Sequence, residues 1–342
     1  MSRRAGQRFT LEMALEEWPL SAPLRITGYT FTTMAFVVVT LSDGVHFGRG
    51  EAAGVFYLDE SPSSLIGQIA AVREEIEAGI TREQLRVLLP PGGARNAVDC
   101  ALWELESMRA RTPVWALAGL EKPAPLLTTY TVGADAPEAM AEVAGVRYRD
   151  ARAIKLKLLG DAHDAARVRA VRIARPDVWL GVDANQGLTR ASLLELLPGL
   201  IEDRVALIEQ PCKRGDESQL DALNSPIPLA ADESVQSLDD IAGLIGRFQV
   251  MNIKLDKCGG LTEALMMARA GRRLGLRIMV GNMGGTALAM APALLVGQHC
   301  EIVDLDGPLF LERERAPSVV YDRGHISAPR DLWGWTAGAQ VD

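Results

Sequence analysis

Eight short apolar segments in the second part of the chain constrain its fold more than any other feature. Each lies between glycine, proline or polar residues, and the stretches between them have the spacing of amphipathic helices. Continuous apolar strands that alternate with helices are typical of a parallel sheet covered on both faces, and eight such strands close a barrel. The segments are TTYTVG near residue 131, RAIKLKLLG near 155, VWLGVDANQ near 183, VALIEQP near 209, IPLAADES near 232, FQVMNIK near 254, LRIMVG near 280 and EIVDLDGP near 304.

Charged residues stand where these segments end. In barrels of this kind the catalytic groups lie at the carboxyl ends of the strands. Successive side chains of a strand alternate between its two faces, so Lys155 and Lys157 share one face. Any one charged residue at a strand end can be explained by contact with solvent. The whole set at one end of a barrel instead indicates a catalytic site. The set consists of Lys155, Lys157, Asp183, Glu209, Asp232, Lys254, Asp304 and Asp306.

Three of these residues, Asp183, Glu209 and Asp232, offer carboxylate ligands from neighbouring strands. No His or Cys accompanies them, and such an oxygen set suits Mg²⁺ better than Zn²⁺. A proton on the carbon next to a carboxylate is very weakly acidic, because its removal creates an enediolate. A divalent cation bound to that carboxylate stabilises the developing charge. We therefore predict a metal-assisted proton-transfer site with one Mg²⁺ per subunit.

The lysines supply the expected acid and base. Lys157 ends the second strand of the predicted barrel and Lys254 ends the sixth, nearly opposite. A substrate across the barrel mouth would have one amine on each face of its α-carbon, which fits inversion of a stereocentre. Lys155 is a second cation near Lys157 and is expected to lower the pKa of its neighbour. In the KLDK run, Lys257 is expected at the surface and Lys254 in the site.

Composition and charge limit the partners. The 342 residues are 48% apolar and 23% charged, as in an ordinary globular protein, with a net charge of -8. Without a basic run, neither nucleic acid nor an anionic membrane is expected as a partner. The four cysteines lack the spacing of a metal or redox site. Acidic residues follow the paired arginines at the N-terminus where an export signal would be apolar, so we expect a mature, cytoplasmic protein.

The first part of the chain has a different pattern and predicts a second domain. RFTLEMALEEWPL and MAFVVVTLSDGVHFGRGEA are expected to be antiparallel strands, the latter with a turn at SDG, and a helical region follows to about residue 117. Gly48, Gly50 and Gly54 miss the GxGxxG spacing of a nucleotide loop and are expected to serve turns and close packing. The predicted α/β fold is thus an eight-stranded TIM-like barrel at 121–315 with an N-terminal α+β domain at 1–120. We expect the segment 316–342 to pack back on this N-terminal domain.

The motifs KLK, DANQ, IEQP, ADES, NIKLDKCGG and VDLDGP together resemble those of the enolase superfamily, in its muconate lactonizing enzyme subgroup, and most of all the dipeptide epimerases. The resemblance covers essentially the whole chain and implies a (β/α)₇β TIM-like barrel with an N-terminal α+β capping domain. It implies that Lys157 and Lys254 are the acid/base catalysts, that Lys155 assists electrostatically, and that Asn185 and Glu233 support the metal ligands. The resemblance also implies Mg²⁺ on the three carboxylates. The mandelate racemase branch uses a His on the seventh strand, and LRIMVGN has none.

Asp304 and Asp306 form the DxD motif that separates reactions within the subgroup. In the dipeptide epimerases the corresponding pair holds the α-ammonium of the first residue. A buried ammonium needs anionic acceptors, whereas substrates without that cation would leave two aspartates unpaired. The resemblance therefore implies an isomerase that inverts the second residue of a dipeptide by Lys/Lys proton transfer. A solvated turn before Gly307 is the structural alternative.

The sequence constrains the side-chain preference of such an enzyme less than it constrains the type of reaction. Relatives that act on Ala-Glu have a basic residue on a capping-domain loop for the glutamate carboxylate. Here PLRITGYTFTTM places Tyr29 at that point, with Arg25 four residues earlier. An acidic second residue is therefore doubtful but stays open. We expect Tyr29, Thr131 and Met283 to contact the substrate.

Other activities stay open. An N-acylamino acid racemase, for example of an N-acetylated acidic amino acid, would use the same lysines and metal. o-Succinylbenzoate synthase and muconate cycloisomerase are further members of the subgroup. A barrel that has lost catalysis would be expected to lack a lysine or a metal carboxylate, and this chain has them all. We also expect a homo-oligomer.

Overall fold

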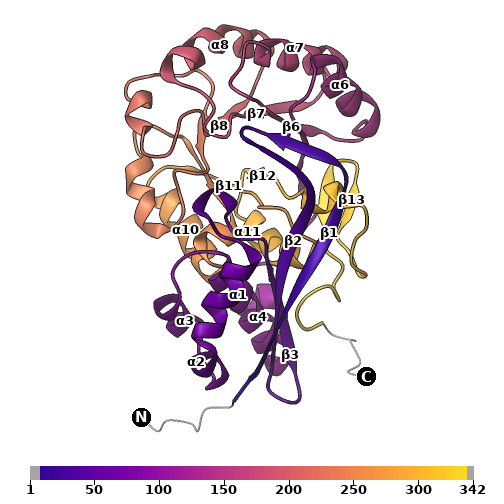
Figure 1. Ribbon diagram of the computed structural model, residues 1–342, viewed down its shortest axis with the longest axis vertical. Coiled ribbons are helices and arrows are strands. Elements are labelled where there is room, and N and C mark those ends of the chain that lie inside the picture. Colours follow the sequence, from indigo (N-terminus) through magenta and orange to yellow (C-terminus); the bar gives the residue numbers. More distant parts are fainter. Residues whose placement is uncertain (1–7, 337–342) are drawn as a thin grey trace.

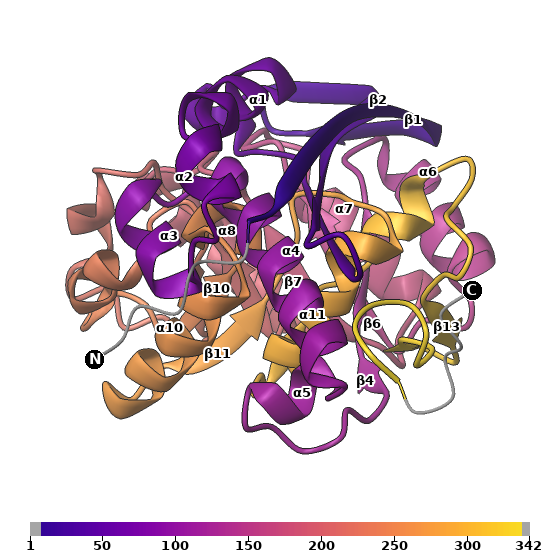
Figure 2. The same ribbon diagram turned by 90° about the horizontal axis from the view of Figure 1, so that it is seen from below.

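The computed structural model describes residues 8–336 (Figure 1). The capping domain begins with a three-stranded antiparallel sheet in the order β1-β2-β3. The Asp43–Gly44 turn of the SDG sequence joins β2 to β3, as predicted. Helices follow this sheet as far as Leu117, and Figure 1 shows α1, α2 and α3 beside α4, away from α7 and α8. Figure 2 shows α1, α2 and α3 grouped together when seen from below. These elements are β1 (Thr10–Ile26), β2 (Tyr29–Ser42), β3 (Phe47–Ala52), η1 (Phe56–Leu58), α1 (Pro62–Ala71), α2 (Arg73–Glu77), α3 (Arg82–Leu88), α4 (Gly93–Ala110) and α5 (Val114–Leu117).

The eight predicted barrel strands are confirmed. They form one parallel sheet in the order β12-β11-β10-β9-β8-β7-β6-β5, so neighbours in space are neighbours in sequence. The strands are β5 (Thr129–Val132), β6 (Ala153–Lys157), β7 (Trp179–Asp183), β8 (Leu207–Glu209), β9 (Leu229–Ala231), β10 (Val250–Ile253), β11 (Arg277–Val280) and β12 (Ile302–Val303). The intervening helical segments are α6 (Pro137–Glu142), η2 (Val143–Arg147), α7 (Asp164–Ala174), α8 (Arg190–Glu202), η3 (Glu217–Leu220), η4 (Leu238–Leu244), α9 (Leu255–Cys258), α10 (Leu261–Arg273), α11 (Ala287–Gly297) and η5 (Gly307–Phe310).

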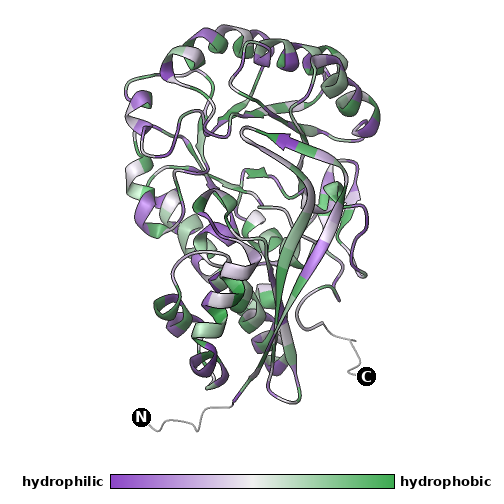
Figure 3. Ribbon diagram, in the orientation of Figure 1, coloured by the Kyte–Doolittle hydropathy of each residue, from purple (hydrophilic) through white to green (hydrophobic). Residues whose placement is uncertain are grey.

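The hydrophobic core lies between the strands and these helices. The outer helices α7 and α8 carry hydrophobic and hydrophilic residues along their length (Figure 3). Their buried side chains include Val168, Val171, Leu193 and Leu200, which pack against the barrel. This one-sided burial is what amphipathic spacing predicts. None of the helices within residues 8–336 is long and apolar enough to cross a membrane.

Side chains bridge the first and last strands of the barrel. Between residues 8 and 336, no backbone ladder joins β5 to β12. Instead, the Leu305 N–H donates to Thr128 Oγ1 at 2.9 Å and the Thr131 N–H donates to Asp306 Oδ2 at 2.6 Å. The Thr129 hydroxyl donates to Asp304. The seam of the barrel is therefore closed by hydroxyl and carboxylate groups.

The β1–β2 hairpin crosses the mouth of the barrel (Figure 1). At its tip, Thr27 Oγ1 donates to the carbonyl oxygens of Leu158 at 2.9 Å and Ala184 at 3.1 Å. These two residues directly follow β6 and β7, so the tip is fixed over the carboxyl ends of the strands. The hairpin therefore forms a wall over the end of the barrel where the charged residues lie.

Buried polar contacts fix the rest of the capping domain to the barrel. Asp256 Oδ1 accepts from the Ala53 N–H at 2.9 Å, and Glu51 accepts from the Thr286 N–H at 2.7 Å. Arg95 Nη2 donates to the Cys258 carbonyl at 2.5 Å. Because these groups are removed from water, breaking any one contact leaves an unsatisfied polar group. The segment after β3 is thereby held at the edge of the barrel mouth.

The C-terminal segment contacts both parts of the chain. β13 (Val320–Asp322) and β14 (His325–Ser327) form a small sheet with β4 (Leu126–Leu127). Further on, Trp333 Nε1 donates to the Arg49 carbonyl at 3.0 Å. We propose that the chain divides into a capping domain at 1–120, the barrel at 121–315 and a C-terminal segment at 316–342.

Gly48 and Gly50 allow β3 to pack closely on α4. A Cβ at Gly50 would overlap the Ala97 carbonyl oxygen, and one at Gly48 would overlap that of Ala101. We predict that Gly50→Ala lowers the free energy of unfolding by about 1–3 kcal/mol, measured by urea denaturation. Gly67→Ala is the matched control, because this helical position has no atom within 4 Å of the added methyl. The control should be stabilised by about 0.5–1 kcal/mol, and equal stability of both variants would contradict the close-packing role.

Candidate active site

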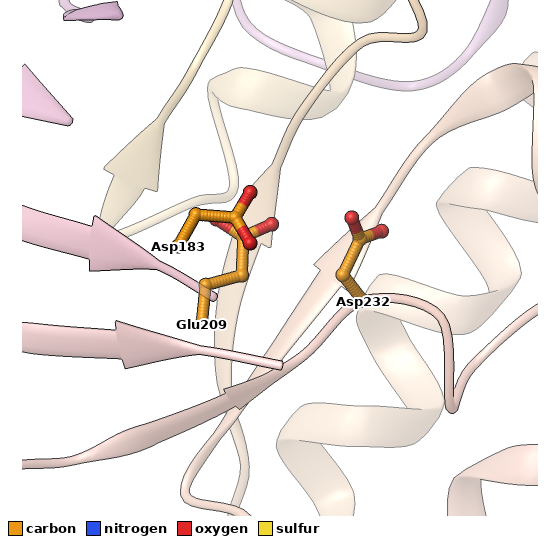
Figure 4. Close-up of side chains that lie close together, drawn as sticks. All are labelled: Asp183, Glu209 and Asp232. Carbon is orange, nitrogen blue, oxygen red and sulfur yellow. The ribbon is translucent and has the colours of Figure 1, made fainter. Parts of the chain in front are cut away.

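Three carboxylates converge at the carboxyl ends of neighbouring strands. Asp183 and Glu209 are the last residues of β7 and β8, and they are paired in register, while Asp232 follows β9. One oxygen from each lies within 4.8 Å of the others, and all three side chains are buried. Figure 4 shows the three groups pointing toward one another. The three strands are consecutive in the sheet, so the side chains at their carboxyl ends are directed into one region.

The environment of the three carboxylates fits a bound cation. Burial and the nearby Asp183 raise the pKa of Glu209 to about 7, and burial and Asp232 raise that of Glu233 to about 8. Crowded negative charge of this kind is relieved by a divalent cation. The donor set is all oxygen, which Mg²⁺ prefers. Asp183, Glu209 and Asp232 are therefore the residues that would hold the metal.

Asn185 and Glu233 lie next to this set. The Asn185 N–H donates to Asp183 Oδ1 at 2.9 Å, and its Nδ2 donates to Glu233 Oε1 at 3.3 Å. Among the residues that the structure describes, Asn185 Oδ1 and Glu233 Oε2 are buried without a hydrogen-bond partner. Both oxygens are thus available to a ligand or to water at the edge of the carboxylate set.

Each carboxylate of the set is paired with one of the three predicted site lysines. Lys157 Nζ lies 2.6 Å from Asp183 Oδ2, and Lys254 Nζ lies 2.6 Å from Asp232 Oδ2. Lys155 Nζ lies 3.2 Å from Glu209 Oε2. The lysine amines are therefore next to the atoms that would hold a metal and close to any carboxylate that the metal binds.

The two expected catalytic lysines enter from opposite sides. Lys157 ends β6 and Lys254 follows β10, while β8, which carries Glu209, is two strands away from each. Burial opposes the charge on Lys254, but Asp232 and Glu209 raise its pKa above the ordinary value. The carboxylates that favour this charge are the same groups that would hold a metal.

Lys155 remains a cation in this environment. Burial opposes its charge, but Asp304 and Glu209 raise the pKa of the amine well above its usual range. Its Nζ donates to Asp304 Oδ2, so Lys155 connects the carboxylate set with the aspartate pair. A permanent positive charge here is consistent with an electrostatic role rather than with proton transfer.

Asp304 and Asp306 are both buried and line the cavity. Lys155 Nζ contacts both Asp304 Oδ2 and Glu209 Oε2, so the aspartate pair lies beside the metal carboxylates. Burial opposes ionisation of Asp304, but Lys155 lowers the pKa of this carboxyl. Burial and Asp304 raise the pKa of Asp306 to about 6. Asp306 accepts from the Thr131 N–H at 2.6 Å, and Asn282 Nδ2 lies 3.5 Å from its other oxygen. A pair this crowded with negative charge is a favourable acceptor for a positively charged group.

The structure corrects the expectation for Lys257. This residue is 2% exposed, and its Nζ contacts Asp232 Oδ1 at 2.6 Å and the Asn252 carbonyl oxygen at 3.1 Å. It lies on the short helix α9, which turns the side chain back beneath the strand ends. Burial lowers the pKa of Lys257, and its contacts fix the position of Asp232.

Sequence reasoning also missed Asn252, whose Nδ2 donates to Glu209 Oε1 at 2.7 Å. The alternation that places Lys254 in the site also places Asn252 there, because the two are separated by one residue of the strand. The alternation in MNIK therefore predicts the face of the strand on which Asn252 lies. An uncharged amide, however, does not by itself indicate a function in the site.

A cavity of about 290 Å³ lies between the barrel mouth and the capping domain. Thr131 and Met283 line it, as expected, together with the three site lysines and the aspartate pair. Tyr29 is not among the lining residues, and its contact with the substrate stays a prediction. Its ring instead stacks on Phe31 at a centroid distance of 6.1 Å and packs against Phe56 at 4.6 Å.

Two family models cover nearly all of the described chain. Residues 8–119 match the N-terminal domain of mandelate racemase/muconate lactonizing enzyme, and residues 138–335 match the enolase C-terminal domain-like model. The boundary between the two matches falls near the start of the barrel strands.

Two curated relatives are similar over most of their length. An L-Ala-D/L-Glu epimerase of Escherichia coli strain K12 is 36% identical over 93% of this chain and 99% of the relative. An N-acetyl-D-glutamate racemase of Pseudoalteromonas sp. is 38% identical over 87% of this chain and 95% of the relative. Among solved structures, the dipeptide epimerase of Enterococcus faecalis V583 complexed with Mg and L-Leu-L-Tyr has a TM-score of 0.88. It is 25% identical, with coverage of 96% of this chain and 98% of that one.

Proposed function

The chain belongs to the mandelate racemase/muconate lactonizing enzyme family of the enolase superfamily, and from this premise we propose that it is a Mg²⁺-dependent dipeptide epimerase. The reaction inverts the α-carbon of the second residue of a dipeptide. Two lysines lie on opposite sides of one carboxylate set, and a buried aspartate pair lines the same cavity. Similarity to an L-Ala-D/L-Glu epimerase and to a dipeptide epimerase solved with Mg and a dipeptide supports the proposal.

We propose a task for each charged group of the site. Asp183, Glu209 and Asp232 would hold the metal, which when bound stabilises the negative charge that develops on the substrate carboxylate. The substrate carboxylate would then lie at the barrel end of the cavity, with its α-carbon between Lys157 and Lys254. One lysine removes the α-proton as a base, and the other delivers a proton to the opposite face.

The other charged groups orient the substrate. Lys155, held as a cation by Asp304 and Glu209, contributes positive charge beside the reacting carboxylate. Asp304 and Asp306 would accept the α-ammonium of the first residue and so fix the peptide across the barrel mouth. The backbone and side chains of β5 hold these aspartates in place through Thr129 and Thr131.

An N-acylamino acid racemase is the second candidate, favoured by the similarity to an N-acetyl-D-glutamate racemase. Its substrates share the carboxylate and the α-proton but lack the ammonium. The aspartate pair therefore distinguishes the two candidates, because an acylated nitrogen offers no cation to two buried carboxylates.

Acetylating the amino terminus of a good dipeptide substrate should lower kcat/KM by about a hundredfold or more, since the aspartates lose their ion partner. Replacing both Asp304 and Asp306 by Asn should weaken free dipeptides most and N-acylated substrates less. Exchange of the α-proton in D₂O, followed by mass spectrometry, measures both effects. An N-acetyl amino acid that turns over faster than every free dipeptide would instead establish the racemase.

We also propose a homo-oligomer in the cytoplasm. Light scattering coupled to size-exclusion chromatography would measure the oligomeric state directly.

A further inference from the structure

The cavity has two chemically different walls. The barrel supplies the charged wall described above, whereas the capping domain and η5 supply an apolar one. The apolar side chains come from the end of β1, the start of β2, η1 and η5, and they are Leu24, Ile26, Phe31, Met34, Phe56 and Phe310.

The reaction geometry directs one substrate group toward this apolar wall. When the α-carbon of the second residue loses its proton it becomes planar, with three substituents in the plane and the two lysines above and below. One substituent is the carboxylate, directed at Asp183, Glu209 and Asp232. Another is the peptide nitrogen, which leads to the ammonium at the aspartate pair. The third substituent, the side chain, is therefore directed away from both sets of carboxylates and toward the capping domain.

No cation in the described part of the capping domain lines the cavity. The basic lining residues are Lys155, Lys157 and Lys254, all from the barrel. Arg25 is close in sequence, but it lies between Leu24 and Ile26, so its side chain leaves the opposite face of β1. Its guanidinium pairs with Asp135 at 3.1 Å, and both side chains are 52% exposed.

Glu60 is the charged residue that the capping domain contributes to the lining. Its carboxylate accepts from the Val55 N–H at 2.9 Å and the Gly93 N–H at 3.1 Å. These contacts explain Glu60 as a structural link between the segment after β3 and the start of α4. A negative charge at this point also disfavours a second carboxylate nearby.

We infer that this apolar wall selects an uncharged, apolar side chain at the second residue of the dipeptide. The inference rests on the proposed function and adds the class of side chain to it. A glutamate side chain would have to enter the wall as a carboxylate without a cation to pair with, which is strongly unfavourable. Phe31 and Leu24, which face each other across the hairpin, are specificity residues in this arrangement.

A panel with two substrate series tests the inference separately from the proposed function. One series is L-Ala-L-X and the other is N-acetyl-L-X, with X being Met, Leu, Phe, Gln, Glu or Lys, and α-proton exchange in D₂O gives kcat/KM. The proposed function is tested by comparing the two series, because an epimerase acts on L-Ala-L-X and a racemase acts on N-acetyl-L-X. The order of side chains within that series tests the inference, and we expect Met to exceed Glu by at least about a hundredfold.

Equal or faster exchange with Glu would overturn the inference, and so would a preference for Lys, which would make Glu60 the specificity residue. Calorimetric titration of the same compounds with Mg²⁺ into the Lys254→Ala protein gives the order of affinities without turnover. The inference therefore has a readout even when neither series reacts.

A charge placed on the wall supplies a second test. Phe31→Arg should raise kcat/KM for L-Ala-L-Glu relative to L-Ala-L-Met by about tenfold or more. Thr32→Arg adds the same charge at an exposed residue outside the lining, on the opposite face of the hairpin, and should leave the order unchanged. A thermal melt checks that both variants fold. If both variants, or neither of them, change the ratio of kcat/KM for L-Ala-L-Glu to that for L-Ala-L-Met, the apolar wall does not select the side chain.

Discussion

Replacing Lys254 or Lys157 with Ala should abolish epimerisation, with a loss of about 10²–10⁴-fold that corresponds to the acid/base contribution. Each variant loses the proton transfer on one face of the α-carbon and retains the amine on the other face. Each should therefore still exchange the α-proton of one stereoisomer, and the two variants should act on opposite isomers. Proton NMR of L,L- and L,D-dipeptides in D₂O separates exchange from inversion.

An exposed lysine outside the cavity provides the control. Lys213→Ala removes the same number of charges without touching the lining, so its activity should stay normal. If Lys254→Ala still interconverts the two stereoisomers at nearly the normal rate, the two-base mechanism is excluded. Loss of exchange with both isomers in a folded variant would indicate that the lysine positions the substrate as well.

Removing the metal should abolish turnover, because the carboxylate next to the α-carbon then lacks the charge that stabilises its deprotonated form. Adding Mg²⁺ to metal-free protein should also stabilise the fold, by about 2.7 kcal/mol at a hundredfold excess over Kd. Asp232→Asn should lose both effects, since it removes one of three ligands. Differential scanning calorimetry with and without Mg²⁺ measures the stabilisation independently of activity.

Asp239→Asn is the matched control for the metal test, because Asp239 is exposed and only seven residues away in the same part of the chain. This variant should keep both activity and the Mg²⁺-dependent stabilisation. Full turnover after exhaustive chelation, confirmed by elemental analysis of the protein, would exclude a metal from the reaction.

The barrel and its charged residues were predictable because they depend on local patterns. Apolar runs between breakers mark the strands, and alternation assigns Lys155 and Lys157 to the same face. The parallel arrangement then brings the strand ends to one edge of the sheet. The convergence of Asp183, Glu209 and Asp232 within 4.8 Å confirms the geometric part of this prediction.

Lys257 was misplaced, and the position of Tyr29 was hard to predict, because both residues lie next to turns. α9 begins immediately after Lys254, and this change from strand to helix ends the alternation on which the surface assignment relied. Tyr29 is positioned by the hairpin turn at Gly28, whose φ of 78° requires the left-handed region. The resulting register pairs Tyr29 with Ile26. Neither turn has a sequence pattern strong enough to fix where the next side chain points.

The side-chain seam between β5 and β12 has a consequence for synthesis of the protein. The hydrogen-bond partners of Thr129 and Thr131 lie 175 residues later in the chain, so they are synthesised long after β5. At ribosomal rates of about 5–20 residues per second, this interval is on the order of ten seconds or more. During this time the β5 edge is open to other strands, and open edges promote aggregation. The capping domain, which leaves the ribosome before β5, is the part of the protein already available to fold during this exposed stage.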